Sequence, residues 1–281
     1  MATSKRLLVV IVAYRNELQL PTVLDQLTPQ LKAGDDVIVV DNSESVTSDL
    51  AARHPRIQFI RPGSNLGFCG GNNYGLQIAD WARYQAVLLL NPDLFLPGQW
   101  IERALKLLFS GEQLQALSGP LLRYDFKAQQ VLPIVDSLGI ARSRFGRWHD
   151  IGSGKAYSDL EPSLPAIWPV QAICGALILL STRALQAAGG IPLFDEQFFA
   201  YKEDVDLGLR LQKAGCKLLI AKELLAYHGR GWKSARREIP FHLRLMSARN
   251  DCRVDWKHRS PYLVVSGLKF AYVSLWERWR R

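Results

Sequence analysis

Three acidic side chains, Glu203, Asp204 and Asp206, fall within four positions at the predicted start of a helix. Acidic residues in a first turn interact favourably with the helix dipole, so the group could simply stabilise that helix. However, Asp204 shares a helix face with Leu207 and Leu211, and these leucines should point to the core. Partial burial raises the pKa of a carboxyl group and makes the carboxylate a stronger base. We therefore interpret Asp204 as a candidate general base.

Two other polar residues end apolar runs and are candidate metal ligands. Asp93 follows residues 86–90 in the tripeptide Asn-Pro-Asp, where one carboxylate could hold Mg²⁺ against substrate phosphates. The same tripeptide is also typical of a simple turn. His228 opens a basic, Gly-rich loop, which favours a metal ligand or a phosphate contact, although a lone histidine at a strand end is more often structural.

Asp41 and the segment 65–75 are candidates for binding a nucleotide. Asp41 directly follows the run Val-Ile-Val-Val, and its carboxylate could accept a hydrogen bond from N3–H of uracil or thymine. The alternative is a helix N-cap. Segment 65–75 combines glycines with amides, which predicts close backbone approach and N–H groups available to a phosphate or ribose. It differs from a dinucleotide fingerprint, because Asn65 replaces the first glycine and the segment follows the third predicted strand.

The elements that position these residues alternate between short apolar runs and helical patterns, which predicts an α/β fold with a parallel sheet. Strands are predicted at residues 7–13, 37–40, 57–60, 87–90, 116–120 and 217–221, and helices at about 20–31, 45–53, 70–84 and 203–214. Residues 122–167 lose this rhythm, and we expect loops and short strands there. Ligands bind beyond the carboxyl ends of parallel strands, so Asp41, Asp93 and Asp204 should line one cleft.

The composition is that of an ordinary globular protein, with 48% hydrophobic and 22% charged residues among 281. We expect a catalytic domain over residues 1–234, with a nucleotide-binding half at about 1–121 and an acceptor half at about 122–234. A basic, aromatic helical extension is expected over residues 235–281. The four cysteines form no C-x-x-C pair and no disulfide framework, so a reducing cytosol fits best.

The formal net charge of +9 lies entirely in residues 229–281, which hold 13 Lys and Arg against 4 Asp and Glu, whereas residues 1–228 hold 22 of each. This asymmetry favours an anionic partner for the tail. Apolar positions in residues 260–276 fall near helical spacing, which predicts an interfacial helix on anionic lipid; the alternative is an amphipathic helix packed on its own domain. No stretch reaches the 18 apolar residues of a spanning helix.

Taken together, these motifs resemble the inverting glycosyltransferases of family 2, which have a GT-A fold (Rossmann-like, with a mostly parallel central sheet and flanking helices), particularly the rhamnosyltransferase-like bacterial members. The matching segments run in the expected order over residues 5–234. They are 12–16, 39–43, 65–67, 71–75, 90–93, 199–207 and His228.

The resemblance implies a nucleotide-sugar donor, a Mg²⁺ or Mn²⁺ cofactor, Asp93 and His228 at the metal and Asp204 as the catalytic base. Donor contacts are expected from Ala13, Tyr14, Arg15, Asp41, Asn65, Gly67, Asn73, Asn91, Asp93 and Glu203. The family's D-x-D motif is reduced here to Asn-Pro-Asp, which makes metal affinity less certain. The absence of a Q-x-x-R-W segment disfavours a processive synthase and favours single-sugar transfer.

The expected reaction moves rhamnose from a dTDP donor, or a hexose from a UDP donor, to a hydroxyl of a lipid-linked or lipopolysaccharide-type acceptor. We expect a cytoplasmic protein, peripheral on the inner face of the cytoplasmic membrane. The alternatives are a nucleotidyltransferase and a non-enzymatic protein that binds an anionic surface or nucleic acid. No RNA-stacking motif or DNA-reading helix is evident, so we expect no nucleic-acid partner.

Overall fold

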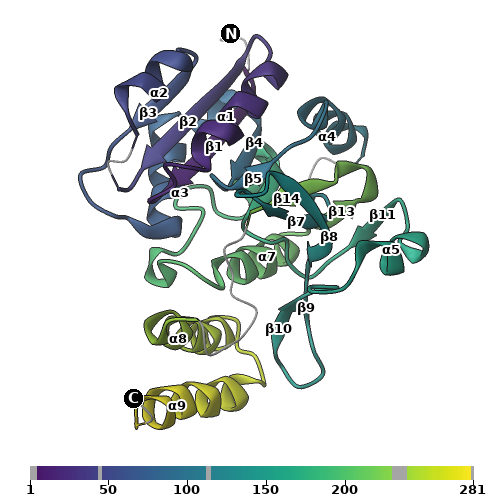
Figure 1. Cartoon of the computed structure of the whole chain (residues 1–281). Helices are drawn as coiled ribbons and strands as arrows, with labels where there is room; N and C mark the ends of the chain where they lie inside the picture. Colours follow the sequence, from purple (N-terminus) through teal and green to yellow (C-terminus); the bar gives the residue numbers. More distant parts are fainter. Residues whose placement is uncertain (1–4, 44–45, 112–114, 230–238, 280–281) are drawn as a thin grey trace.

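The computed structural model describes residues 5–43, 46–111, 115–229 and 239–279, with side chains as far as residue 275, and is built around an eight-stranded sheet (Figure 1). The strand order is β11-β13-β6-β12-β4-β1-β2-β3. The bounds are β1 Lys5–Ala13, β2 Asp35–Asp41, β3 Ile57–Ile60, β4 Tyr84–Leu90, β6 Gln115–Ser118, β11 Ile167–Pro169, β12 Leu177–Ser181 and β13 Lys217–Ala221. β12 is antiparallel to both neighbours and β11 to β13, whereas the other pairs are parallel. The predicted α/β fold is confirmed.

The central strands are buried over most of their length, which explains why they contain continuous apolar runs. Residues 7–11 of β1 and 37–40 of β2 are between 0% and 2% exposed. A strand covered on both faces loses the alternation of apolar and polar residues that a half-exposed strand shows. The limits predicted from these runs for residues 57–60 and 217–221 coincide with β3 and β13.

The helices around this sheet follow the predicted order, but two were predicted too long, since the helix expected at about 20–31 ends at Leu27 and continues only as a 3₁₀ turn to Gln30. Their bounds are α1 Leu20–Leu27, α2 Ser48–Arg53, α3 Gly67–Ile78, α4 Trp100–Ser110, α6 Thr182–Ala187 and α7 Glu203–Lys213, with 3₁₀ turns η1 Thr28–Gln30, η2 Trp81–Arg83, η4 Glu196–Phe198 and η5 Lys222–Leu224. The helix predicted over 70–84 is too long, because Asp80 adopts a left-handed φ of 52° and Tyr84 already starts β4. Residue 45 of the helix predicted over 45–53 lies outside the described residues.

A second sheet, in the order β5-β14-β7-β8, lies beside the first (Figure 1). The elements of this region are β5 Leu94–Phe95, β7 Leu121–Asp125, β8 Gln130–Ser137, β9 Ile140–Arg142, β10 Trp148–Asp150, α5 Tyr157–Leu160, η3 Glu161–Ser163 and β14 Ala226–His228. The short strands predicted for residues 122–167 are therefore confirmed. In this sheet Leu94, the residue after Asp93, pairs with His228, the last residue of β14. The pairing brings the Asp93 loop close to His228.

The C-terminal residues form two packed helices, α8 Phe241–Lys257 and α9 Leu263–Trp279, at one end of the molecule (Figure 1). The buried carboxylate of Asp206 on α7 joins this extension to the rest of the chain, because it lies 2.8 Å from His258 Nε2 and 3.1 Å from Lys257 Nζ. Within the described ranges, no helix is both long and apolar enough to cross a membrane. The basic helices predicted after residue 229 are confirmed for residues 241–279.

Candidate active site

The parallel strands β1, β2 and β4 end at one edge of the sheet, where the antiparallel strand β12 begins. Leu90, the last residue of β4, pairs with Leu177, the first residue of β12. The chain on either side of this pair stays together, because the N–H of Asn91 donates a 2.9 Å hydrogen bond to the carbonyl of Ala176. Residues after β4 and residues before β12 therefore form one rim.

His228 lies at this rim between two carboxylates. Its Nδ1 is 2.8 Å from Oδ2 of Asp136 on β8, and its Nε2 is 3.4 Å from Oδ1 of Asp93. Although burial lowers the pKa of His228, the two carboxylates raise it to about 9. Burial raises the pKa of Asp93, but the opposing effect of His228 prevails and the pKa is lowered. The structure thus brings the two predicted metal ligands together.

The distance between Asp93 Oδ1 and His228 Nε2 suits two ligands of one divalent ion, because bonds from such ions to oxygen and nitrogen are about 2.0–2.2 Å long. Asp136 would orient the imidazole from its other nitrogen, as carboxylates do around many metal ions. Among the described residues, no group of three or more His, Cys, Asp or Glu side chains could hold a metal ion. The pair would leave the other coordination positions of a divalent ion to substrate phosphates and waters, and His228 would have to lose its proton to act as a ligand.

Asp204 lies in the first turn of α7 and accepts hydrogen bonds from two backbone N–H groups, those of Gly175 (3.2 Å) and Val205 (2.8 Å). Burial raises its pKa, partly offset by the charge of Lys202. Glu203 beside it is 7% exposed, and its Oε2 is buried without a hydrogen-bond partner. Burial and the charge of Asp204 raise the pKa of Glu203 to about 8, and because burial raises the pKa of both neighbouring carboxyl groups, the pair holds a proton more readily than two exposed acids would. The raised basicity predicted for Asp204 is present.

Backbone contacts connect Asp204 to the loop of Asp93. Gly175, which donates its N–H to Asp204, directly precedes Ala176, which accepts the N–H of Asn91. Asn91 in turn lies two residues before Asp93. Asp204 and the loop that carries Asp93 are therefore held by two adjacent residues, Gly175 and Ala176. This placement can serve a reaction in which a proton is removed close to a phosphate leaving group.

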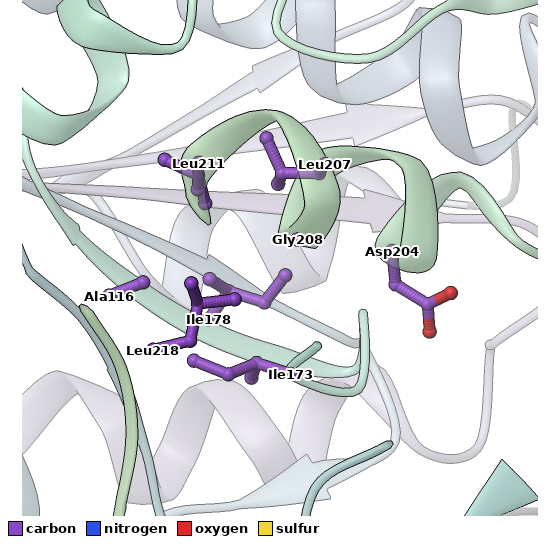
Figure 2. Close-up of a pocket in the computed structure, with 8 residues that line it drawn as sticks. All are labelled: Ala116, Ile173, Ile178, Asp204, Leu207, Gly208, Leu211 and Leu218. Carbon is purple, nitrogen blue, oxygen red and sulfur yellow. The ribbon is translucent and has the colours of Figure 1, made fainter. Parts of the chain in front are cut away.

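Asp204, Leu207, Gly208 and Leu211 of α7 line one small hollow, as their spacing predicts (Figure 2). The other lining residues are all apolar: Ala116, Ile173, Ile178 and Leu218. The hollow does not admit a water molecule, so it is packing space and not a binding cavity. Figure 2 shows Asp204 at its end, with the carboxylate directed away from the apolar side chains.

The turn before α7 is strained and is held by the C-terminal extension. The residues with positive φ are Phe199 (60°), Tyr201 (69°) and Lys202 (72°). Such a conformation costs about 1–3 kcal/mol per residue and persists only where the surroundings enforce it. The fully buried side-chain nitrogen of Asn250 on α8 lies 2.9 Å from three carbonyl oxygens of this turn, those of Phe198, Ala200 and Tyr201, and shares its two hydrogens among them. α8 therefore takes part in positioning the start of α7.

Asp41, the third predicted acid, ends β2 at the same edge but is engaged by its own loop. Its Oδ2 accepts a 2.8 Å hydrogen bond from the N–H of Val46, and its Oδ1 accepts from the N–H and hydroxyl of Ser43 (3.2 and 3.3 Å). Its side chain is fully buried. The alternative N-cap role is wrong, because Thr47 caps α2. A nucleobase could reach the Asp41 carboxylate only if its contacts with Ser43 and Val46 were rearranged.

The first-turn N–H groups of α3 are also occupied. Gly67 donates its N–H to Asn65 Oδ1 at 2.9 Å, and Phe68 and Cys69 both donate to the carbonyl of Phe199, at 2.9 and 3.2 Å. The prediction that this segment leaves N–H groups available to a phosphate is therefore wrong for these three residues. Gly67 has a φ of 68°, and a Cβ there would lie 2.6 Å from the Phe199 ring. Glycine is required for this contact between α3 and the turn before α7.

The remaining predicted donor contacts lie in two places. Ala13 ends β1, Tyr14 and Arg15 follow it beside the Asp41 loop, and the N–H of Arg15 donates to Ser43 Oγ at 2.9 Å. Asn73 is buried and exchanges hydrogen bonds of 2.8 and 3.0 Å with the backbone of Phe194. The polar atoms of Asn73 are thus used within the fold, whereas Tyr14 is 44% exposed.

Three residues of this site were not identified from the sequence: Asp136, Gly175 and Asn250. Asp136 is 92 positions from His228, and Asn250 is 49–52 positions from the carbonyls it holds, so no local spacing marks either residue. Gly175 interrupts an apolar run just before β12, and a glycine at such a point often marks close backbone approach. That signal could have been used.

Comparison with known proteins places this geometry in context. Residues 8–136 match the family model described as "Glycosyl transferase family 2". The "Low-salt glycan biosynthesis hexosyltransferase Agl10" of Haloferax volcanii is 25% identical over 242 residues, which cover 84% of this chain and 71% of that protein. An "N-acetylglucosaminyl-diphospho-decaprenol L-rhamnosyltransferase" of Mycobacterium tuberculosis is 30% identical over 201 residues, or 64% of this chain and 61% of that protein.

Solved structures share the fold at low sequence identity. The crystal structure of GalNAc-T7 with UDP, GalNAc and Mn²⁺ has a TM-score of 0.67 and 13% identity, and it covers 91% of this chain. The chain spans 48% of that structure, so about half of GalNAc-T7 has no counterpart here. The mannosyltransferase PcManGT of Pyrobaculum calidifontis, with GDP-Man and Mn²⁺, has a TM-score of 0.58 and 16% identity over 99% of this chain and 72% of that one. The fold is GT-A.

Proposed function

We propose that this chain, which belongs to glycosyltransferase family 2, moves a single sugar from a nucleoside-diphosphate sugar to a hydroxyl of a lipid-linked or cell-envelope glycan acceptor, with inversion. The names of two relatives support the acceptor class, since one denotes glycan biosynthesis and the other a diphospho-decaprenol substrate. The rhamnosyltransferase among them makes dTDP-rhamnose the first donor to test, and a UDP-hexose the second.

The observation that carries this proposal is the connection of Asp204 to the Asp93 loop through Gly175 and Ala176. Asp204 removes the proton of the acceptor hydroxyl as its oxygen attacks the anomeric carbon from the face opposite the diphosphate. The new C–O bond forms while the bond to the diphosphate oxygen breaks, and the proton stays on Asp204. One displacement of this kind inverts the anomeric centre.

Asp93 and His228 are the proposed ligands of a Mg²⁺ or Mn²⁺ ion, and the Mn²⁺ in two structures of the same fold supports this assignment. When bound, such an ion supplies positive charge that stabilises the departing diphosphate. Asp136 fixes the orientation of the His228 ring through Nδ1. Protonated Glu203 is able to donate a hydrogen bond to a sugar hydroxyl, which a carboxylate cannot do.

We assign the nucleobase of the donor to the end of β1 and the Asp41 loop, and we keep Asn65 and Asn91 as proposed contacts of the donor. We also propose residues 1–234 as the catalytic domain and residues 235–281 as its extension. The excess of basic residues in the tail supports a peripheral position on the inner face of the cytoplasmic membrane, near a lipid-linked acceptor.

Substitution of Asp204 by asparagine tests the proposed reaction. Asp204→Asn should lower sugar transfer by about 10³-fold or more, because amides do not act as general bases, while thermal stabilisation by the nucleotide sugar and Mn²⁺ persists. Asp49→Asn, an exposed acid on α2, is the matched control and should leave both properties unchanged. Near-normal transfer by Asp204→Asn would refute the assignment.

A further inference from the structure

α9 exposes a wide apolar face on the side away from α8. Five apolar side chains between 49% and 70% exposed lie on it: Val264, Val265, Leu268, Tyr272 and Leu275. At 3.6 residues per turn, these positions fall within about 100° of the helix circumference. The buried positions Ser266 and Val273, 6% and 0% exposed, fall on the opposite side. One side of the helix is therefore packed, and an apolar face of about 100° is left uncovered.

The tip of the β9–β10 hairpin adds another exposed apolar side chain at the same end of the molecule as α9 (Figure 1). Phe145 at this tip is 68% exposed, and the guanidinium of Arg144 lies 4.6 Å from its ring centroid. The hairpin is fixed to the start of α9, because the hydroxyl of Tyr262 donates to the carbonyl of Arg144 at 3.2 Å and Arg142 stacks on the Tyr262 ring at 4.3 Å. Residues more than 100 positions apart thus form one surface.

The charges around this surface are basic. Asp255 is buried and paired with Arg142, and Asp251 is paired with Lys269, so both acidic side chains that the structure describes in the extension are neutralised within the fold. Arg144 and Arg259, in contrast, are exposed. A face that is apolar in the middle and basic at its border complements a bilayer with anionic headgroups.

We propose that the exposed face of α9 and the hairpin tip at Phe145, together called the α9–hairpin face, lie on an anionic lipid bilayer. The inference deepens the proposed function, on which its biological purpose rests, by naming the surface that meets the membrane. A second copy of the chain fits less well, because a two-fold contact through this face would bring the basic borders of two copies together. Contact through α9 would also place α8, which holds the turn before Asp204, on the membrane side of the protein.

Flotation of the full-length protein with vesicles tests this surface. Vesicles of phosphatidylcholine with phosphatidylglycerol should bind the protein at low salt, whereas high salt or phosphatidylcholine alone should weaken binding. Leu268→Glu should weaken partitioning about tenfold or more, since it replaces an inserted apolar side chain by a charge of the same sign as the lipid. Phe145→Glu should also weaken binding. Phe109→Glu on α4, where Phe109 is 49% exposed, is the matched control and should bind normally.

Three results would overturn the proposal: wild-type protein that does not float with anionic vesicles, equal binding by Leu268→Glu and wild type, or equal loss in Phe109→Glu. Dimers that Leu268→Glu converts to monomers without any vesicle binding would instead assign the face to a second copy. Transfer to a water-soluble acceptor analogue separates this test from the proposed function. Leu268→Glu should retain that transfer, whereas a wild-type protein that floats but transfers no sugar would contradict the proposed function alone.

Discussion

Asp41 and Asp204 lie at the same edge of the sheet and each accepts hydrogen bonds from two backbone N–H groups, yet only Asp204 lies beside a second buried carboxyl group. The donors to Asp41 are those of Ser43 and Val46 in its own loop. Burial raises the pKa of Asp204 and raises that of its neighbour Glu203 to about 8. A carboxyl group that is costly to ionise suits proton transfer.

The elements that hold the two acids also differ. Asp41 continues a regular parallel strand, accepts hydrogen bonds from residues two and five positions away, and has Arg61 Nε 3.7 Å from its Oδ2. Asp204 follows a turn in which Phe199, Tyr201 and Lys202 adopt positive φ, and that turn contacts Asn250 of a distant helix. The comparison indicates that the position of the proposed base depends on a turn held from a distant helix, whereas Asp41 is the end of a regular strand.

The largest effect that sharpens this comparison is expected from Asn250→Ala. Without the amide, the turn before α7 loses the hydrogen bonds that Nδ2 shares among its three carbonyls and Asp204 shifts, so kcat should fall about 100-fold with the donor KM little changed. If Asp204 becomes more hydrated, its pKa falls, and the acid limb of the kcat–pH profile should move to lower pH. Arg249→Ala, an exposed residue of the same helix, is the control. A variant that is less stable but has an unchanged kcat and pH profile would assign Asn250 a purely structural role.

A smaller effect is expected from Asp41→Asn. Replacing a charged acceptor by an amide weakens the loop that closes on Val46 and Ser43, and each hydrogen bond to a charged group is worth about 1.5–3 kcal/mol. The donor KM should therefore rise about tenfold while kcat stays within about twofold, as steady-state kinetics with a saturating acceptor would measure. A fall in kcat comparable to that of Asp204→Asn would break the distinction between the two acids.

The smallest effect is expected from Glu203→Gln and concerns stability. The pKa of Glu203 is about 8 in the folded chain against an ordinary value of 4.5, so between these pH values the folded state holds a proton that the unfolded state has lost. The free energy of unfolding of the wild type should fall as the pH rises through this window, and this part of the slope should be absent in Glu203→Gln. Urea unfolding at about pH 5.5 and 8.5 measures the difference. Glu223→Gln, an exposed acid, should keep the wild-type slope.

The fold was largely predictable because its determinants are local. Continuous apolar runs mark β1, β2 and β4, and such runs survive only where both faces of a strand are buried. The face of α7 that carries Asp204 with Leu207 and Leu211 follows from helical spacing alone. The pairing of Asp93 with His228 agrees with the prediction of both as metal ligands, although the sequence could not place the two residues side by side.

The parts that could not be predicted depend on distant partners. The carbonyl of Phe199 occupies the first N–H groups of α3, and the glycine-rich sequence of that helix gives no sign of it. Thr47, and not Asp41, caps α2 because the loop after β2 is longer than a direct strand-to-helix turn. Asp136 reaches His228 only through the pairing of β8 with β7 and of β7 with β14. Each of these contacts forms only when the strands that end at this edge of the sheet have come together.

The charge cluster around Asp206 has a practical consequence for shortening this protein. Asp206 is fully buried, and although burial raises its pKa, His258, Arg210 and Lys257 lower it to about 2. A fragment cut after residue 234 would keep Arg210 but lose the other two cations, leaving an ionised group in the interior with too little compensation. Expression of the first 234 residues alone should therefore yield a poorly folded product, and work on the isolated glycosyl-transfer chemistry would need α8 retained.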